Sequence, residues 1–246
     1  MPLATAIIPA RYASSRFPGK PLADRTGKTL IQHVVEAVRD ARTIDRIIVA
    51  TDDQRIAAAV TGFGGRAVMT RADHPNGTSR IAEVAAGLDP GSCPIVVNVQ
   101  GDEPDIEPRL IDRLVEALDE DPDVPMATLA GPFTEQEDPT DPNIVKVVVD
   151  RRGRAIYFSR AQIPHDRDGR GTRPLKHAGL YAYRRDFLLQ YVQLAPTPLE
   201  QAEQLEQLRA LEHGHAIAVV EAPLKHHGID TPQQYEAFVV RERTNG

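Results

Sequence analysis

Residues 4–22, ATAIIPARYASSRFPGKPL, join a short apolar run to a loop that combines cations with turn residues. The run over residues 4–9 has the length and the apolar character of a buried strand. Arg11, Arg16 and Lys20 lie in the loop that follows it. In an open α/β sheet, ligands bind beyond the carboxyl ends of the strands, so this loop is the first place to expect a site.

The first half of the chain continues as an alternation of strands and helices. The segments with helical spacing are residues 29–41, 53–63, 81–88 and 108–118, and the β-rich or apolar runs between them are residues 46–51, 67–70 and 94–99. Such alternation favours a parallel sheet. We therefore expect an α/β fold with a mostly parallel central sheet.

The middle of the chain differs, because residues 119–124 and 131–142 are acidic and rich in turn residues. We expect a single domain, residues 1–246, with a smaller inserted lobe over about residues 127–183. Within the lobe, the charged, Gly-rich residues 166–173 predict a mobile loop. The remaining expected elements are a strand over residues 144–149, a helix over 199–213, a strand over 216–220 and a helix over 232–243.

Composition narrows the class of protein. The chain has 246 residues, of which 41% are hydrophobic, and this length is enough for a substantial core. The net charge of -6 argues against a general nucleic-acid surface, so local cations must bind any anionic ligand. We expect a cytoplasmic protein without a membrane partner, because no membrane-spanning stretch or signal peptide is evident. The lone Cys93 is expected to be a reduced core residue.

Two loops carry the candidate chemistry. The cations and backbone N–H groups of the loop with Arg11, Arg16 and Lys20 suit a triphosphate, although a solvated basic loop is the alternative. Neither a Walker A loop nor a Rossmann fingerprint is present. Asp102 follows the apolar run that ends at residue 99, and it is the best candidate ligand for Mg²⁺. A helix or turn cap is the alternative role for this residue. Asp230 precedes Pro232, and its local sequence alone favours an N-cap.

Five strings in this sequence resemble CMP-Kdo synthetases, the 3-deoxy-manno-octulosonate cytidylyltransferase family. They are IPARYASSRFPGKPL at residues 8–22, MTRADH at 69–74, NVQGDEP at 98–104, YFSR at 157–160 and LEQLR at 205–209. The resemblance extends from about residue 7 to residue 235. It implies a Rossmann-like nucleotidyltransferase fold and an enzyme that moves the CMP of CTP onto a small acidic acceptor, releasing pyrophosphate. It also implies a homodimer, and we expect the inserted lobe over about residues 127–183 to serve acceptor binding and dimerisation.

The resemblance implies roles for individual residues. Lys20, Arg16, Asp102 and Asp230 would be catalytic, and the two aspartates would coordinate Mg²⁺. The nucleotide-binding residues would be Pro9, Ala10, Arg11, Ser15, Arg16, Lys20, Arg71, Gly77, Thr78, Arg80 and Gln100, with residues 77–80 forming a turn. The acceptor-binding residues would be Gln100, Arg160, His177, Tyr181, Glu206 and Gln207, with Arg160 suited to the acceptor's carboxylate.

The sequence departs from the family pattern at His165 and at Lys225-His226-His227-Gly228. These positions belong to the acceptor side, so the acceptor is less firmly indicated than CTP. The sugar acid Kdo is favoured by the retained His177, Glu206 and Gln207. A phosphonate such as phosphonoformate, the acceptor of a natural-product pathway, is the alternative.

Proteins of other classes fit the sequence less well. A nucleotide-sugar glycosyltransferase would not need the cationic loop, and a non-catalytic nucleotide-binding module would be expected to lose Lys20 or one aspartate. A zinc site could be imagined at His213 and His215 or at His226 and His227. Neither pair has a Cys cluster or helical spacing to support it.

Overall fold

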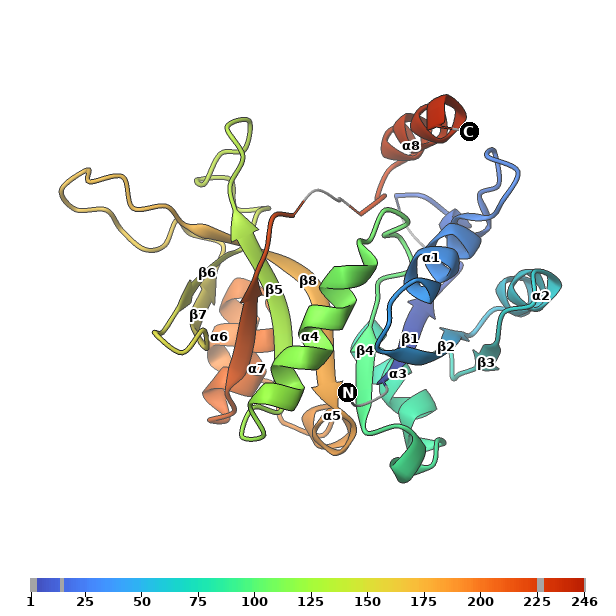
Figure 1. Cartoon of the computed structure of the whole chain (residues 1–246), viewed down its shortest axis with the longest axis horizontal. Coiled ribbons are helices and arrows are strands. Elements are labelled where there is room, and N and C mark those ends of the chain that lie inside the picture. The colour runs from blue at the N-terminus through green and yellow to red at the C-terminus, as the bar shows by residue number, and fades with distance from the viewer. Residues whose placement is uncertain (1–3, 14–15, 225–227, 246) are drawn as a thin grey trace. The chain divides into compact units, whose positions relative to one another are not determined.

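The computed structural model describes residues 4–13, 16–224 and 228–245 of the chain (Figure 1). It divides into two compact units. We call residues 2–112 and 226–246 the amino-terminal unit, and residues 113–225 the middle unit. The lobe expected over residues 127–183 falls within the middle unit, which extends beyond it on both sides. The role of that lobe in acceptor binding and dimerisation stays a prediction.

The sheet of the amino-terminal unit is parallel throughout. Its strands are β1 (Ala4–Ala10), β2 (Ile44–Thr51), β3 (Ala67–Met69) and β4 (Ile95–Asn98), in the order β3-β2-β1-β4. In the central strand, Ile7 pairs with Ile48 on one side and with Asn98 on the other. The expected α/β fold is confirmed, and all four strands end at the same edge of this sheet.

Helices connect these strands, as the alternation predicted. They are α1 (Leu30–Arg39), α2 (Gln54–Gly62) and α3 (Gly77–Ala86), with short 3-10 turns at Lys20–Leu22 and Pro90–Ser92. The carboxy-terminal helix α8 (Pro232–Asn245) belongs to the same unit but connects no strands. Residues 77–80 are the first turn of α3 and not a separate turn, so that expectation was wrong. The reason is Asn76, whose side chain accepts a hydrogen bond from the Ser79 N–H and caps the helix.

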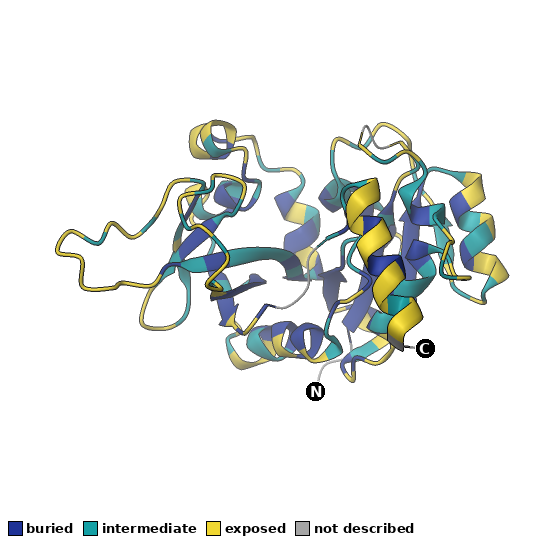
Figure 2. Cartoon of the chain, turned by 90° about the horizontal axis from the view of Figure 1, so that it is seen from above, coloured by how far each residue is buried: buried dark blue, intermediate teal, exposed yellow. Residues whose placement is uncertain are grey.

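The core of this unit follows from the apolar runs. Every residue of β4 is buried, and Cys93, shortly before it, is buried as well, as expected. Helix α8 buries Tyr235 and Phe238, while Val240 is 62% exposed. Figure 2 shows this contrast as dark and yellow faces of the helix that ends at the carboxyl terminus. In the part of the chain that the structure describes, no helix combines the length and apolarity that crossing a membrane requires.

The middle unit is built on antiparallel pairs with one parallel edge. Its strands are β5 (Met126–Pro132), β6 (Lys146–Val149), β7 (Ala155–Ser159), β8 (Leu175–Arg184) and β9 (Ile217–Glu221). β5 pairs antiparallel with β8 and parallel with β9, and β6 pairs antiparallel with β7 and β8. Helix α4 (Pro108–Glu120) begins in the amino-terminal unit and ends in this one, and α5 (Arg185–Tyr191) follows β8.

The single helix expected over residues 199–213 is wrong, because two short helices lie there. They are α6 (Pro198–Glu203) and α7 (Gln207–Glu212). The break occurs at Gln204, which adopts the left-handed conformation with φ 53°. Arg160 stabilises this corner, since its side chain donates hydrogen bonds to the carbonyl oxygens of Glu203 (2.7 Å) and Gln204 (3.4 Å).

Candidate active site

A pocket of about 380 Å³ opens in the amino-terminal unit, next to the ends of β1 and β4. It contains most of the residues that the sequence assigned to the nucleotide. Its lining consists of Pro9, Ala10, Arg11, Arg16, Lys20, Pro21, His74, Pro75, Asn76, Gly77, Arg80, Gln100, Gly101, Asp102 and Asp230. The position agrees with the rule that ligands of open α/β sheets bind beyond the carboxyl ends of the strands.

Lys20 lies between two carboxylates in this pocket. Its Nζ donates a hydrogen bond of 2.6 Å to Oδ2 of Asp102 and lies 3.6 Å from Oδ1 of Asp230. The Lys20 side chain is only 12% exposed. Arg16, by contrast, is 65% exposed and pairs with Asp230 at 3.1 Å. Two cations and two anions therefore form one cluster, with the buried ammonium group at its centre.

Backbone hydrogen bonds bring Asp230 to Asp102, although the two are far apart in sequence. The N–H of Ile229 donates to the carbonyl oxygen of Asp102 at 2.8 Å, and the Ile229 carbonyl accepts from Lys20 Nζ at 2.8 Å. Asp230 is not the cap of α8. That position is held by Thr231, whose hydroxyl accepts from the Gln234 N–H at 3.3 Å. The carboxylate of Asp230 thus faces the cluster.

Of the two neighbouring acids Asp102 and Glu103, only Asp102 lines the pocket. Burial, together with the nearby charge of Asp102, raises the pKa of Glu103 to about 8. Glu103 is therefore mostly protonated at neutral pH, whereas Asp102 pairs with Lys20. The negative charge of this loop is presented to the pocket by Asp102.

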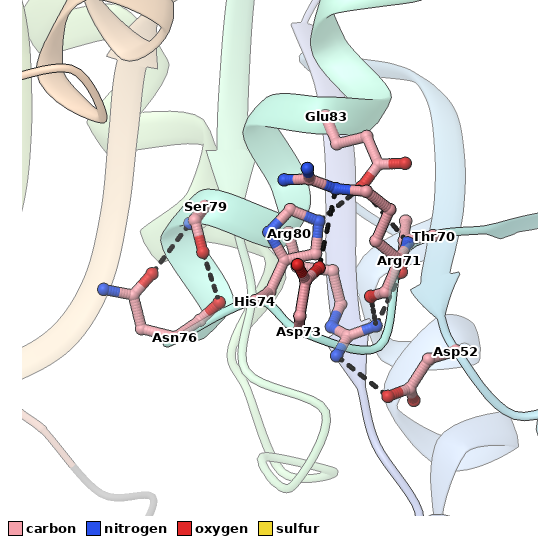
Figure 3. A network of polar contacts seen from close by, with 9 residues as sticks. All are labelled: Asp52, Thr70, Arg71, Asp73, His74, Asn76, Ser79, Arg80 and Glu83. Atoms are coloured by element: carbon pink, nitrogen blue, oxygen red, sulfur yellow. Dashed lines mark hydrogen bonds and ion pairs between the residues drawn. The ribbon is translucent and has the colours of Figure 1, made fainter.

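The loop before α3 also lines the pocket, and Arg80 holds this loop in place (Figure 3). The Arg80 guanidinium is 5% exposed and donates to the Thr70 hydroxyl at 2.5 Å and to Oδ2 of Asp52 at 3.2 Å. Its charge is thus balanced by Asp52. Arg80 shapes the wall and does not present an unpaired cation to a ligand.

His74 and Glu83 connect the same loop to α3 (Figure 3). Nε2 of His74 forms a very short hydrogen bond with Oε2 of Glu83, and the Glu83 carboxylate also accepts the Arg71 N–H at 3.2 Å. His74 stands in the family string MTRADH, but no role was predicted for it. A role for Asn76 was not predicted either, although the Asn-Gly step before a helix was an available signal.

Two of the expected nucleotide residues are not part of the pocket lining, and a third is not described by the structure. The Arg71 side chain is 69% exposed, pairs with Asp73 and Glu83, and is not part of the pocket lining. Thr78 is buried in the first turn of α3 and is not part of the lining either. Ser15 lies outside the described residues, as do His226 and His227.

The expected acceptor residues, apart from Gln100, belong to the middle unit. His177 on β8 has Nε2 2.9 Å from the Thr128 hydroxyl, and its ring contacts Phe158 and Tyr181. Burial lowers the pKa of His177 to about 3, and burial also raises the pKa of Tyr181 well above its usual value. Both side chains are therefore neutral at physiological pH.

Gln207 and Glu206 lie at the start of α7. Gln207 is 4% exposed, and its Nε2 is buried without a hydrogen-bond partner among the described residues. Since a buried donor without a partner costs about 1–3 kcal/mol, such a group is a reasonable place for a ligand oxygen. The Glu206 carbonyl accepts from the Tyr191 hydroxyl at 2.5 Å, which anchors the first turn.

Arg160 also belongs to the middle unit, where backbone carbonyls occupy its guanidinium. Besides Glu203 and Gln204, Pro142 accepts from Nη1 at 3.0 Å. The carboxylate of Glu203 in turn accepts the Arg160 backbone N–H at 2.9 Å. These contacts give Arg160 a structural role that the resemblance did not indicate.

The chemistry of the donor set suits a hard divalent cation. The carboxylates of Asp102 and Asp230 supply oxygen ligands beside a cationic loop, and Mg²⁺ is commonly held by one or two carboxylates together with substrate phosphates. Among the residues that the structure describes, no group of three or more His, Cys, Asp or Glu side chains could hold a metal ion. Two carboxylates beside a cationic loop fit a metal that a bound phosphate helps to coordinate.

Comparison with known proteins identifies the family. The family model described as "Cytidylyltransferase" matches residues 5–217. A 3-deoxy-manno-octulosonate cytidylyltransferase of Syntrophotalea carbinolica is 56% identical over 238 residues, covering 93% of this chain and 94% of the relative. The chain belongs to the 3-deoxy-manno-octulosonate cytidylyltransferase family. A second relative with that name, from Syntrophobacter fumaroxidans, is 57% identical over 235 residues, covering 95% of this chain and 94% of its own.

Solved structures that resemble this chain support the assignment to this family. The CMP:2-keto-3-deoxy-manno-octonic acid synthetase complexed with CTP has a TM-score of 0.94 and 45% identity, covering 99% of this chain and 100% of that one. A 4-diphosphocytidyl-2C-methyl-D-erythritol synthase from Anaerococcus prevotii has a TM-score of 0.65 at 14% identity and shares the fold. The chain is therefore a nucleotidyltransferase of the cytidylyltransferase type, as the sequence predicted.

Proposed function

We propose that this chain transfers CMP from CTP to 3-deoxy-manno-octulosonate (Kdo) and releases pyrophosphate. The observation that carries the proposal is the meeting of Asp102 and Asp230 at the Lys20 ammonium group, inside a pocket lined by further arginines. The names of relatives more than 50% identical supply the acceptor. These names favour Kdo, and we therefore do not propose a phosphonate as the acceptor.

In the proposed reaction a hydroxyl oxygen of the acceptor, which gives up its proton to solvent, attacks the α-phosphorus of CTP in line. The new P–O bond forms as the bond to the bridging oxygen breaks, and pyrophosphate leaves with that oxygen. Lys20 and Arg16 offset the negative charge that collects on the leaving group. Because the Lys20 ammonium is nearly buried, its interaction with that charge is weakly screened.

Asp102 and Asp230 would hold Mg²⁺ in this proposal. When bound, the ion would neutralise phosphate charge and polarise the phosphorus–oxygen bonds. Lys20 contacts both carboxylates and so keeps them side by side. Gln100, which comes shortly after β4 and lines the same pocket, would orient the ligand.

The middle unit would supply the groups that recognise the acceptor. The unpaired Nε2 of Gln207 can donate to a sugar-acid oxygen, and the neutral His177 and Tyr181 avoid burying charge next to it. We extend the proposal to a homodimer that works in the cytoplasm, which the family resemblance implies.

A turnover assay with two acceptors tests the proposal. Pyrophosphate release would be followed with CTP and Mg²⁺, comparing Kdo with phosphonoformate and including a reaction with EDTA. We expect turnover with Kdo that depends on the metal and a much lower kcat/KM with phosphonoformate. If phosphonoformate is the better acceptor, or if Kdo gives no pyrophosphate, the proposal is wrong.

A further inference from the structure

The two ends of the nucleotide pocket differ in charge. Arg16, Lys20, Asp102 and Asp230 gather at one end, which suits phosphates and a metal. The part of the lining formed by residues 74–77 has Arg80 and Arg71 near it, and both are already paired, Arg80 with Asp52 and Arg71 with Asp73 and Glu83. A nucleotide that places its triphosphate at the charged end would therefore direct its uncharged base toward residues 74–77.

His74 is the side chain in that wall with an aromatic ring. It lines the pocket although its side chain is only 4% exposed, and Nε2 is fixed by the short hydrogen bond to Glu83. Glu83 is fixed in turn by the Arg71 N–H at 3.2 Å. The ring is therefore held in one orientation by contacts outside the pocket.

These contacts determine which ring nitrogen carries the proton. The hydrogen bond from His74 lowers the pKa of Glu83, so its carboxylate is ionised and can only accept. Nε2 must then donate, and in the neutral ring Nδ1 keeps its lone pair. Nδ1 makes no hydrogen bond to any residue that the structure describes. It is thus an acceptor in the pocket wall with no partner from the described protein.

We propose that His74 selects cytosine, its Nδ1 accepting a hydrogen bond from the 4-amino group of the base, and that Glu83 is a positioning residue that sets this acceptor. Cytosine offers an N–H donor at this position, whereas uracil offers an oxygen acceptor. Two acceptors would then face each other when UTP occupies the pocket. The inference rests on the proposed binding of CTP in this pocket and adds how the base is distinguished.

The test compares the affinity for CTP with the affinity for UTP in the absence of any acceptor. Equilibrium binding to the full chain would be measured with Mg²⁺ present. We expect the wild-type protein to prefer CTP, and His74→Leu to reduce that preference by at least about tenfold, the effect of losing one hydrogen bond to a desolvated group. Glu83→Gln should also reduce the preference, because an amide can donate to Nε2 as well as accept from it.

Asp73→Asn is the matched control for Glu83→Gln. Asp73 also pairs with Arg71, at 3.6 Å, but its side chain is 77% exposed, and it is not part of the pocket lining. It should keep the wild-type ratio. A variant in which CTP and UTP weaken equally would reveal a purely structural role for His74 and overturn the inference, as would a wild-type protein that binds both equally.

The outcome is separable from that of the acceptor assay. A protein that prefers CTP but makes no product with Kdo would contradict the proposed reaction. The ratio of its CTP and UTP affinities could still be measured, and it would still test the role of His74. A protein that turns over Kdo with an unchanged ratio in His74→Leu would support the reaction and contradict the role of His74. Thermal unfolding of each variant identifies those that do not fold, and for these the His74→Phe substitution, which keeps an aromatic ring but has no acceptor nitrogen, gives the same comparison.

Discussion

The pocket of the amino-terminal unit and the buried polar groups of the middle unit are built in different ways. In the pocket, Lys20, Asp102 and Asp230 are charged and satisfy one another. In the middle unit, His177 is neutral, and Gln207 has a buried donor without a partner among the described residues. Charge that must be offset during phosphoryl transfer is handled by paired ions, whereas recognition of a polar acceptor is better served by neutral, desolvated donors.

The largest expected effect comes from the charged region. Asp102→Asn preserves the shape of the side chain but removes the partner of Lys20 at 2.6 Å and one oxygen ligand of the proposed metal. We expect turnover to fall at least about a hundredfold, a typical cost of losing one electrostatic contact to a reacting group. Steady-state pyrophosphate release measures this.

Asp105→Asn is the control for that experiment, since Asp105 lies three residues further along and forms a surface ion pair with Arg241. It should retain turnover close to that of the wild type. If Asp102→Asn keeps more than about a tenth of the wild-type turnover, the electrostatic role of Asp102 is contradicted.

A smaller effect, of a different kind, is expected in the neutral region. Gln207→Leu removes a buried N–H that has no partner among the described residues, so the free energy of unfolding should stay the same or rise. The same change should raise the KM for Kdo by about tenfold and leave the KM for CTP unchanged. Chemical denaturation and steady-state kinetics together check both parts. A loss of stability with an unchanged KM for Kdo would mean that the amide serves the fold.

The pH dependence of stability should distinguish the two regions as well. Burial lowers the pKa of His177 from 6.5 to about 3, so below pH 6.5 the unfolded chain binds a proton that the folded chain does not. The wild type should therefore lose stability relative to His177→Gln as the pH falls, by about 1 kcal/mol per pH unit between roughly pH 6 and 4. Urea denaturation at several pH values measures it. Parallel curves for the two proteins would show that His177 is not held neutral.

The smallest expected effect concerns the corner between α6 and α7. Gln204 adopts φ 53°, which glycine tolerates better, so Gln204→Gly should stabilise the fold by up to about 1 kcal/mol without changing the KM for CTP. Gln201→Gly, on the exposed part of α6, should destabilise it by a similar amount. Thermal unfolding compares them. Destabilisation by both would show that the Gln204 conformation carries little strain.

Local patterns were sufficient for the parts of the molecule that local forces determine. The apolar runs predicted β1 and β4, and the cations and acid after them predicted the pocket that holds Lys20 and Asp102. Asp230 could not be placed in this way, because it reaches Asp102 through backbone hydrogen bonds of Ile229 that no local pattern encodes. The family resemblance provided that pairing.

The misses have the same origin. The residues next to Gln204 include neither Gly nor Pro, so nothing local predicts the break between α6 and α7. The break is stabilised by Arg160, which directly follows β7. The role of His74 depends on its hydrogen bond to Glu83, which lies nine residues later on α3. It also depends on the pocket that His74 lines. Interactions between segments, and not propensities within them, decide these features.

The most direct test of the account is ³¹P NMR of the wild-type protein with CTP, Mg²⁺ and Kdo. We predict that the triphosphate signals disappear while one phosphodiester signal, coupled to the sugar acid, and one pyrophosphate signal grow in equal amounts. Hydrolysis of CTP without a phosphodiester, or unchanged CTP in the presence of a folded protein, would contradict CMP transfer to Kdo.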